Sequence, residues 1–255
     1  MKYKLYTTAE RPDLVTSGDE IVVANWPEFM LHDEIASEYF PKLYKEFPEF
    51  QFWLIDESND NKIVGIGNSI PLFFDGDLKD LPEKGWDYAL QKGFEDKENG
   101  VKPNILCALA ITMNPEYKEK GISHQMVKAI MELGRRGKFN RLILPVRPSE
   151  KHKYPLISMD EYLKNNIRED NFSTDPWVRV HQRLGGKIIK PCNEAMLIEG
   201  SVKDWENWAK MEFSISGEYV VPFALATVKI DIEKDLGTYI EPNIWMVHEL
   251  GYHIV

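Results

Sequence analysis

The chain has 255 residues, of which 43% are hydrophobic, which is enough apolar material for one large domain or two modest ones. Its 31 Lys and Arg residues stand against 41 Asp and Glu residues, and the net charge of −10 argues against non-specific binding to nucleic acid or to an anionic membrane. Two cysteines are too few for a disulfide framework or a zinc site. Because there is no apolar leader region and no long apolar run, we expect a cytoplasmic protein with no membrane association and no metal.

In chain order, the first predicted element is a strand over residues 2–8 (KYKLYTT), where polar and apolar side chains alternate. The spacing of apolar residues then predicts a helix over residues 27–47, which Pro48 ends. Two apolar runs flank the turn-forming residues 58–61 and predict a β-hairpin over residues 50–74.

The middle of the chain predicts a βαβ unit. Residues 75–103 are polar and acidic, and we expect an insertion there with one short helix around residues 86–94. The run ILCALAITM (105–113) is apolar enough for a strand buried on both faces. An amphipathic helix follows Gly121, and RLILPV (141–146) is a second buried strand, so the three elements form a right-handed crossover.

The rest of the chain carries clear boundary signals. Pro145 has no N–H for a ladder, so its strand is expected to part from its neighbour there or to lie at an edge. Ser158 and Glu161 have the spacing of a capping box, and another helix is expected to begin at Asp175 and to end before Gly185. Strands are expected around residues 195–200 and 218–230.

We expect one domain over residues 1–255, with a C-terminal extension from about residue 200 to residue 255. Within that extension Trp205 and Trp208 share a helical face. Their side chains are interpreted as core packing, as a wall of an acceptor pocket or as the seam of a homodimer, and the sequence does not choose between these.

The turn between the two buried strands has the features of an anion site. A helix N-terminus offers free backbone N–H groups and a partial positive charge. Gly121 lets a ligand approach the backbone, and Lys118 and Lys120 add positive charge. The motif is neither a P-loop nor a Gly-x-Gly-x-x-Gly loop, and an ordinary βα turn with solvated lysines is the alternative.

The order of these elements over residues 50–189 resembles the GCN5-related N-acetyltransferase (GNAT) superfamily: a hairpin with DNKIVGIG, the strand ILCALAITMNP, the turn YKEKGIS, an amphipathic helix, LILPV, and a helix ending in HQRLGGKII. The resemblance implies an α/β (mixed α+β) fold. Its centre is a mixed, mostly antiparallel twisted sheet with a splayed parallel βαβ core, flanked by helices.

The resemblance also implies a site for acetyl-CoA or another acyl-CoA. The family motif, Gln or Arg, two residues, Gly, one residue, and then Gly or Ala, is matched here by Lys118, Glu119, Lys120, Gly121, Ile122 and Ser123. The glycine matches, Lys118 keeps only the charge, and Ser123 replaces the smaller residue. In the family, backbone groups of the preceding strand hold the pantetheine arm, which corresponds here to Ile111, Thr112 and Met113.

Catalytic residues are less evident. Where the family often has a tyrosine that protonates the departing thiolate, VHQRLGG places His181, which either fills that role near neutral pH or is a polar helix residue. No general base is evident, since residues 105–113 contain no acid and Glu116 is expected to face solvent. His248 and His253 have no partner at metal-ligand spacing.

A cation-rich loop, RPSEKHKYP, follows the second central strand. It is expected either to meet an acidic substrate or the cofactor's 3′-phosphate, or simply to be solvated. Its charged side chains are Arg147, Glu150, Lys151, His152 and Lys153.

Together these features predict an acyl-CoA-dependent N-acyltransferase that moves acetyl from acetyl-CoA to a primary amine by direct attack in a ternary complex. The acceptor is expected to be a small molecule or a peptide. Two alternatives remain: a non-catalytic CoA- or acyl-binding module, and a GNAT-like protein that acts on acyl thioesters without amine transfer.

Overall fold

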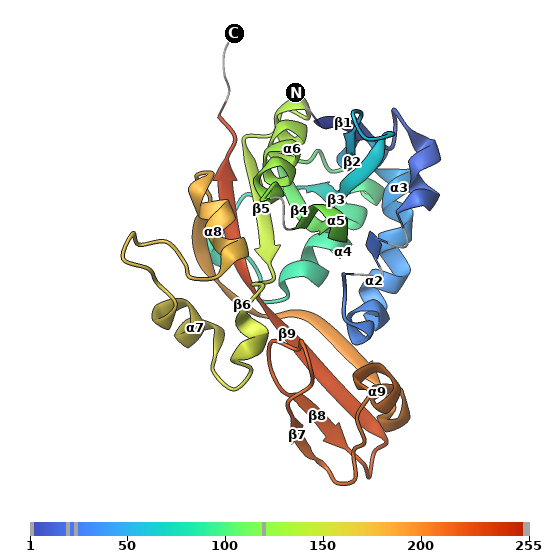
Figure 1. The fold of residues 1–255 in the computed structure, drawn as a ribbon, viewed down its shortest axis with the longest axis vertical. Coiled ribbons are helices and arrows are strands. Elements are labelled where there is room, and N and C mark those ends of the chain that lie inside the picture. The colour runs from blue at the N-terminus through green and yellow to red at the C-terminus, as the bar shows by residue number, and fades with distance from the viewer. Residues whose placement is uncertain (1–2, 19–20, 23–24, 119–120, 252–255) are drawn as a thin grey trace.

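The computed structural model describes residues 3–18, 21–22, 25–118 and 121–251, and its centre is one mixed sheet with helices on both faces (Figure 1). The described part of the sheet has nine strands: β1 (Tyr3–Thr7), β2 (Gln51–Asp56), β3 (Lys62–Leu72), β4 (Ile105–Met113), β5 (Arg141–Val146), β6 (Lys187–Gly200), β7 (Gly217–Tyr219), β8 (Val228–Asp231) and β9 (Leu236–Glu249). Their order is β1-β2-β3-β4-β5-β9-β8-β7, and β6 pairs with β9. Within the described sheet only β4 and β5 pair in parallel, which confirms the mixed, mostly antiparallel fold.

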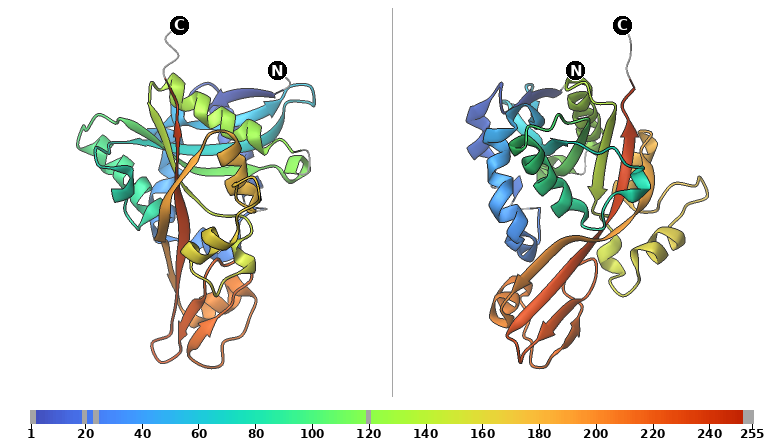
Figure 2. Two further views of the ribbon diagram at one scale, coloured as in Figure 1. Left: turned by 90° about the vertical axis from the view of Figure 1, so that its left-hand side faces the viewer. Right: turned by 180° about the vertical axis from the view of Figure 1, so that it is seen from behind.

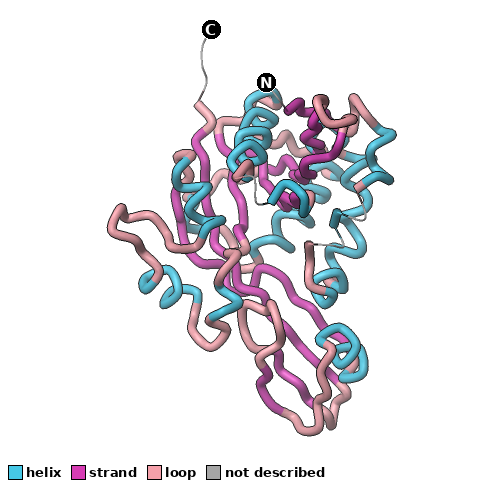
Figure 3. Tube along the Cα trace, viewed as in Figure 1, coloured by secondary structure: helices cyan, strands magenta, loops and turns pink. Residues whose placement is uncertain are grey.

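Helices flank these strands along the whole chain (Figure 3). The α-helices are α2 (Glu34–Tyr39), α3 (Leu43–Glu46), α4 (Gly85–Glu98), α5 (Pro115–Lys118), α6 (Ser123–Arg136), α7 (Met159–Asn165), α8 (Pro176–Arg183) and α9 (Val202–Ala209). The 3-10 helices are η1 (Pro12–Ser17), η2 (Glu28–His32), η3 (Phe40–Lys42), η4 (Pro48–Phe50), η5 (Leu78–Asp80) and η6 (Lys151–Lys153). No helix in the described ranges is long and apolar enough to cross a membrane.

Buried side chains form a large cluster on each face of the sheet. Successive residues of a strand point to opposite faces, and along β4 Cys107 belongs to one cluster while Leu106 belongs to the other. Helix α4 covers the Cys107 face, where Leu90 is buried, and α6 covers the Leu106 face, where Met126 is buried. Figure 2 shows these layers from the side and from behind.

The predicted βαβ unit is confirmed, and its two strands separate. β4 and β5 pair only through Leu106 with Leu142 and Cys107 with Ile143. Beyond that point β5 continues beside β9, where Pro145 lies opposite Trp245. Pro145 has no N–H to donate to a neighbouring strand, so a separation of β4 from β5 at this position costs no hydrogen bond from Pro145. The separation agrees with the prediction for this residue.

Strand β9 is long enough to pair with two different strands, one after the other, along the same edge. Its residues from Ile244 to Glu249 pair with β5, and those from Leu236 to Tyr239 pair with β8. Between them, the stretch 240–243 has no strand partner on this side among the described pairs. Strands β6 and β9 carry β7, β8 and α9 away from the main body (Figure 1).

Local signals account for most element boundaries. The predicted hairpin is confirmed, and its turn places Asp60 and Asn61 at φ of 50° and 54°, a region that Asn and Asp tolerate. Ser158 and Glu161 form the predicted capping box of α7. Asp175 caps α8 by accepting hydrogen bonds from two backbone N–H groups.

Two predicted elements are wrong in detail. The single helix expected over residues 27–47 is divided into η2, α2, η3 and α3, because Asp33 starts a new helix by capping Ala36 N at 2.6 Å and Pro41 interrupts the ladder. The strand expected over residues 218–230 is divided into β7 and β8, and Phe223 between them has a φ of 68°.

Residues 75–103 contribute more than the short helix expected. Helix α4 has 14 residues and buries Trp86, Ala89 and Leu90 against the sheet. Its buried side chains recur at helical spacing, which is why this acidic stretch folds against the core.

Candidate functional site

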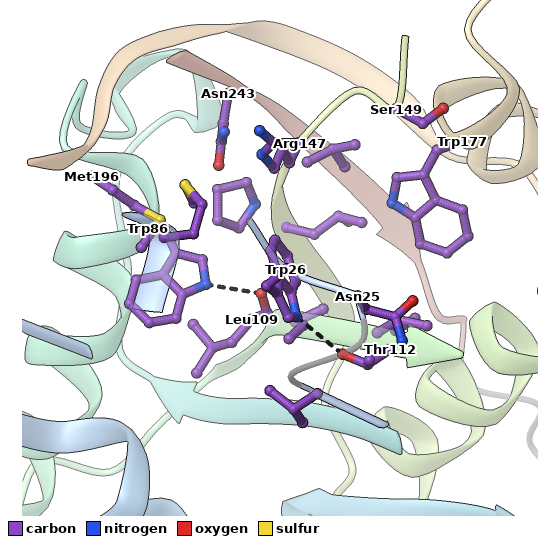
Figure 4. Close-up of a pocket in the computed structure, with 18 of the residues that line it drawn as sticks. Asn25, Trp26, Trp86, Leu109, Thr112, Arg147, Ser149, Trp177, Met196 and Asn243 are labelled. Atoms are coloured by element: carbon purple, nitrogen blue, oxygen red, sulfur yellow. Dashed lines mark hydrogen bonds between the residues drawn. The ribbon is translucent and has the colours of Figure 1, made fainter. Parts of the chain in front are cut away.

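A cavity of about 940 Å³ lies where β4 and β5 separate (Figure 4). Its walls come from both faces of the sheet. Trp86 of α4 and Met30 of η2 line it on one face, and Trp177 and Val180 of α8 line it on the other. The cavity therefore passes through the sheet at the gap between the two strands.

Most of the residues predicted to bind a cofactor lie at one end of this cavity. The lining includes Ile111, Thr112, Met113, Lys118 and Ser123. Glu119 and Lys120 lie outside the described residues. The structure thus brings five of the nine predicted residues to one wall.

Gly121 and Ile122 lie just before α6 and shape the approach to its N-terminus. Gly121 has a φ of 65°, and a Cβ added there would meet no atom within 4 Å, so the space beside its backbone is open. Ile122 is the N-cap residue of α6, and its apolar side chain gives no capping hydrogen bond. Gln125 N donates to Ile122 O at 2.8 Å, and the backbone N–H groups before it in the first turn, which the side chain of Ile122 does not cap, can bind an anion.

The backbone of β4 presents polar groups to the gap. Asn114 donates its N–H to Val64 O in β3 at 2.9 Å, and because strand groups alternate, the amides of Met113 and Ile111 face away from β3, toward β5. Asn25 Nδ2 donates to Met113 O at 3.0 Å. A register shift between β3 and β4 falls at Leu109, which is left without a partner in the register, and Trp86 Nε1 donates to its carbonyl at 2.8 Å.

His181 lines the same cavity from α8 and is 1% exposed. Its Nδ1 lies 3.0 Å from Nε2 of His248, which is also buried, and its own Nε2 has no hydrogen-bond partner in the structure. Burial, and then the neighbouring His248, lower the pKa of His181 to about 3. The imidazole is therefore neutral near pH 7, and the expected proton donor of ordinary pKa is wrong in that respect.

His248 was not foreseen as a partner of His181. The two residues are 67 positions apart, and only the placement of β9 beside α8 brings them together. Burial lowers the pKa of His248 to about 4, so the pair is uncharged near pH 7.

The other end of the cavity is mostly apolar and aromatic. Trp86, Phe40 and Met196 line it, together with a few polar groups. Trp26 lies between this end and β4, because its Nε1 donates to Thr112 Oγ1 at 3.4 Å (Figure 4). No sequence pattern points to Trp26, whereas Trp86 begins the helical pattern around residues 86–94.

The polar groups at this end surround Glu241, which is fully buried. Arg147 Nε lies 2.6 Å from Glu241 Oε1, Tyr239 donates its hydroxyl to Oε2 at 2.5 Å, and Asn243 Nδ2 donates to Oε1 at 3.3 Å. The acid was not identified from the sequence, because Glu241 lies far from residues 105–113, where an acid was sought. Glu116, by contrast, is exposed as predicted and pairs with Lys62 at 2.6 Å.

Behind the apolar end lie two further buried carboxyl groups, Asp33 before α2 and Asp87 in α4. Asp33 Oδ2 and Asp87 Oδ1 have no hydrogen-bond partner in the structure. Burial raises the pKa of Asp33 to about 6, and burial together with the nearby Asp33 raises the pKa of Asp87 to about 8. Neither residue lines the cavity, so both are treated as structural groups.

Comparison with known proteins gives three informative matches. No protein-family model matches the chain. The chain is 29% identical over 275 aligned residues to a protein named arginine N-acetyltransferase avaD, from Aspergillus versicolor, and this match covers 97% of the chain and 94% of the relative.

Two solved structures share the fold. The loading GNATL domain of CurA from Lyngbya majuscula superimposes with a TM-score of 0.62 at 18% identity, covering 97% of this chain and 98% of that one. The GphF GNAT-like decarboxylase in complex with isobutyryl-CoA superimposes with a TM-score of 0.53 at 14% identity, covering 98% of this chain and 100% of that one.

Proposed function

We propose that the chain is a member of the GCN5-related N-acetyltransferase superfamily and an acyl-CoA-dependent N-acyltransferase that transfers acetyl from acetyl-CoA to a primary amine of a small acceptor of the arginine type. The observation that carries this proposal is the cavity that passes through the sheet where β4 and β5 separate. Two ligands that enter from opposite faces can meet there. The similarity to a named arginine N-acetyltransferase supports the class of acceptor.

The donor half of the cavity has the groups that an acyl-CoA requires. Open space beside Gly121, the start of α6 and the cation of Lys118 suit the diphosphate, and Lys120 is proposed to join them. The amides of Ile111 and Met113, which face the gap, suit the amide-bearing pantetheine arm. Thr112, Glu119, Ile122 and Ser123 complete the proposed binding segment.

Bound acyl-CoA supplies a thioester carbonyl for direct attack by the amine and a thiolate that leaves as the new amide forms. The chain's part is to hold the two ligands in line and to polarise the carbonyl with a backbone N–H near Met113. The attacking nitrogen must lose a proton, and the departing sulfur must gain one.

We place His181 between these two proton positions. The residue lines the cavity and its imidazole is neutral, while its Nε2 is buried without a hydrogen-bond partner in the structure. The contact between Nδ1 and His248 determines whether Nε2 carries the proton. With no proton on Nε2, His181 takes one proton from the nitrogen of the neutral amine once that nitrogen has bonded to the carbonyl carbon, and gives it to the departing thiolate, so that no proton is gained or lost overall.

A thiol-release assay tests the proposed function. Purified protein with acetyl-CoA and arginine is expected to release free CoA in proportion to added arginine, and mass spectrometry should show arginine heavier by one acetyl group. Omitting the amine gives the background rate. Tight binding of acetyl-CoA by calorimetry without thiol release, over a panel of amines, would instead indicate a non-catalytic binding module.

Replacing Gly121 by alanine is expected to weaken acetyl-CoA binding on the order of tenfold, because a Cβ would occupy the open space beside the amides that the diphosphate approaches. Gly100 is a matched control, since its φ is also 65° and a Cβ there would also meet nothing within 4 Å. Both substitutions should cost about 1 kcal/mol of stability. Calorimetry that finds the same affinity in both variants would rule out this turn as the diphosphate site.

The setting of the reaction follows from the same proposal. We place the protein in the cytoplasm, where acetyl-CoA and free amines are both present, without nucleic acid or membrane partners. A peptide acceptor and a homodimer are further expectations from the sequence. Trp205 is fully buried within this chain, which favours core packing for that residue over a dimer seam.

A further inference from the structure

Buried charges lie at the acceptor end of the cavity and directly behind it. Glu241 and Arg147 line the cavity, where Glu241 is 0% exposed and the side chain of Arg147 is 19% exposed. Lys151 does not line it and is 0% exposed. Contact with an anionic ligand and solvation were the two expectations for this loop, but Lys151 Nζ donates to Leu225 O at 2.7 Å and to Tyr154 O at 2.8 Å. Arg147 Nη2 donates to Phe223 O at 2.6 Å in addition to its ion pair with Glu241.

At the cavity wall the charge of Arg147 is paired with Glu241. Lys151 lies behind this pair and donates to uncharged carbonyls, and burial lowers its pKa to about 8, with Glu241 opposing this shift. A second buried carboxylate, Asp175, contacts the same loop, where it accepts a hydrogen bond from Glu150 N at 2.7 Å. The buried charges therefore offset one another, and what remains for a ligand is the unused hydrogen-bonding capacity of Arg147.

The other charged residues along the described lining do not contact the guanidinium of Arg147. Glu150 lines the cavity but forms an ion pair with Lys153 on the surface. Lys118 is positive and lies at the donor end. Asp33 and Asp87 do not line the cavity.

The position of Arg147 places this charge on the acceptor side. Leu144 and Val146 of β5 belong to the cluster under α6 and α8, so alternation turns Arg147, the next residue, to the opposite face with Trp86. Figure 4 shows Arg147 beside Asn243 in the wall of the cavity. The gap in pairing along β9, residues 240–243, is where this wall opens.

The guanidinium is not saturated by its contacts. It carries five N–H groups in a planar fork, and the contacts to Glu241 and Phe223 leave several of them for a ligand. An arginine with free N–H groups at the wall of an apolar cavity is well suited to a carboxylate.

We propose that Arg147 binds the carboxylate of the acceptor, so that the enzyme selects amino acids over amines that lack a carboxyl group. The kinetic test of this inference rests on the proposed N-acyl transfer, because it measures turnover. The ligand class is an α-amino acid with a cationic or aromatic side chain, whose remaining atoms lie among the tryptophans of the acceptor end.

The test compares amino acids with their decarboxylated counterparts: arginine with agmatine, lysine with cadaverine, and tryptophan with tryptamine. For the wild-type protein, kcat/KM for the best amino acid should exceed that of its counterpart on the order of 10²-fold, because the counterpart leaves the remaining N–H groups of Arg147 without an acceptor. In Arg147→Gln this ratio should fall to about one, chiefly through loss of activity on the amino acid. Equal activity on both members of each wild-type pair would overturn the proposal.

A second variant separates recognition from folding. Arg147→Gln leaves Glu241 buried without its cation, so the double variant Arg147→Gln, Glu241→Gln restores charge balance while keeping hydrogen-bonding groups. It should fold, as judged by circular dichroism, and should also show a ratio of about one. A double variant that is folded and still prefers the amino acid as strongly as wild type would also refute the role of Arg147.

Binding measurements keep the two proposals distinguishable. Trp26 and Trp86 line the cavity, so tryptophan fluorescence can follow binding of arginine and agmatine without turnover. If no amine supports thiol release but arginine still binds more tightly than agmatine, and Arg147→Gln abolishes the difference, the transfer function fails while the carboxylate site stands. If both bind equally while thiol is released, the carboxylate site fails and the transfer function stands.

Discussion

Replacing His181 by alanine is expected to lower kcat by about 10²-fold or more while the KM for acetyl-CoA changes little. The imidazole is placed to carry a proton only as the amide bond forms, so its loss affects the transition state rather than ground-state binding. Steady-state kinetics over a range of pH, at saturating acceptor, measures the effect.

Controls for His181 address folding and the role of His248. Removing one partner of the buried pair leaves the other unpaired at a cost of about 1–3 kcal/mol, so assays should be run well below the melting temperature. His32→Ala changes a histidine outside the cavity lining and should leave kcat unchanged. A His181→Ala variant that is folded and retains wild-type kcat across the pH range would assign the proton transfer to water.

Asp87→Asn is expected to stabilise the protein increasingly as pH rises. Burial raises the pKa of Asp87 to about 8, so the folded carboxyl keeps a proton that the unfolded chain loses near its ordinary pKa of about 4. Between these values the unfolded state binds fewer protons, and the stability of the wild type falls by about 1.4 kcal/mol per pH unit. Asparagine has no such proton. The free energy of unfolding of the variant, relative to that of wild type, should therefore rise by about 3 kcal/mol between about pH 5 and about pH 7.

Urea denaturation at several pH values measures this difference. Asparagine can keep the hydrogen bond that Leu197 N donates to Asp87 Oδ2 at 3.2 Å. Asp80→Asn is the control, because Asp80 is exposed and its substitution should leave the pH dependence as in wild type. A loss of stability in Asp87→Asn that is the same at every pH would mean that the folded carboxylate is ionised.

Local patterns in the sequence were sufficient for the central part of the fold. The apolar run 105–113, the glycine at 121 and the strand 141–146 predicted the βαβ unit, because each signal acts within a few residues. The turn at Asp60 and the capping box at Ser158 are local in the same sense.

The acceptor side could not be predicted in this way. Trp26, Trp86, Arg147 and Glu241 come from four distant segments, and only the pairing of β9 with β5 brings two of them together. The burial of Lys151 depends on carbonyls at Tyr154 and Leu225, one of which is 74 residues away. The charge of the loop indicated solvation, because the residues next to Lys151 in the sequence do not reveal the distant carbonyl group that it contacts in the fold.

The family resemblance supplied the donor segment, which has a short motif, but it supplied nothing equivalent for the acceptor. His181 was located by its place in the chain, whereas its neutral state depends on burial and on His248. Sequence motifs therefore identified the residues of the site that are adjacent in the chain. The residues that only folding brings together could be identified from the structure alone.

The route of the cavity through the sheet has a consequence for how such an enzyme diversifies. Side chains that face α4 can be exchanged without repacking those that face α6, because the sheet backbone separates the two layers. New acceptor preferences can then arise by substitutions on one layer while affinity for the acyl donor is inherited unchanged on the other. Duplicated copies of such a gene would be expected to diverge at Arg147, Met196 and Asn243 before they diverge at the turn preceding α6.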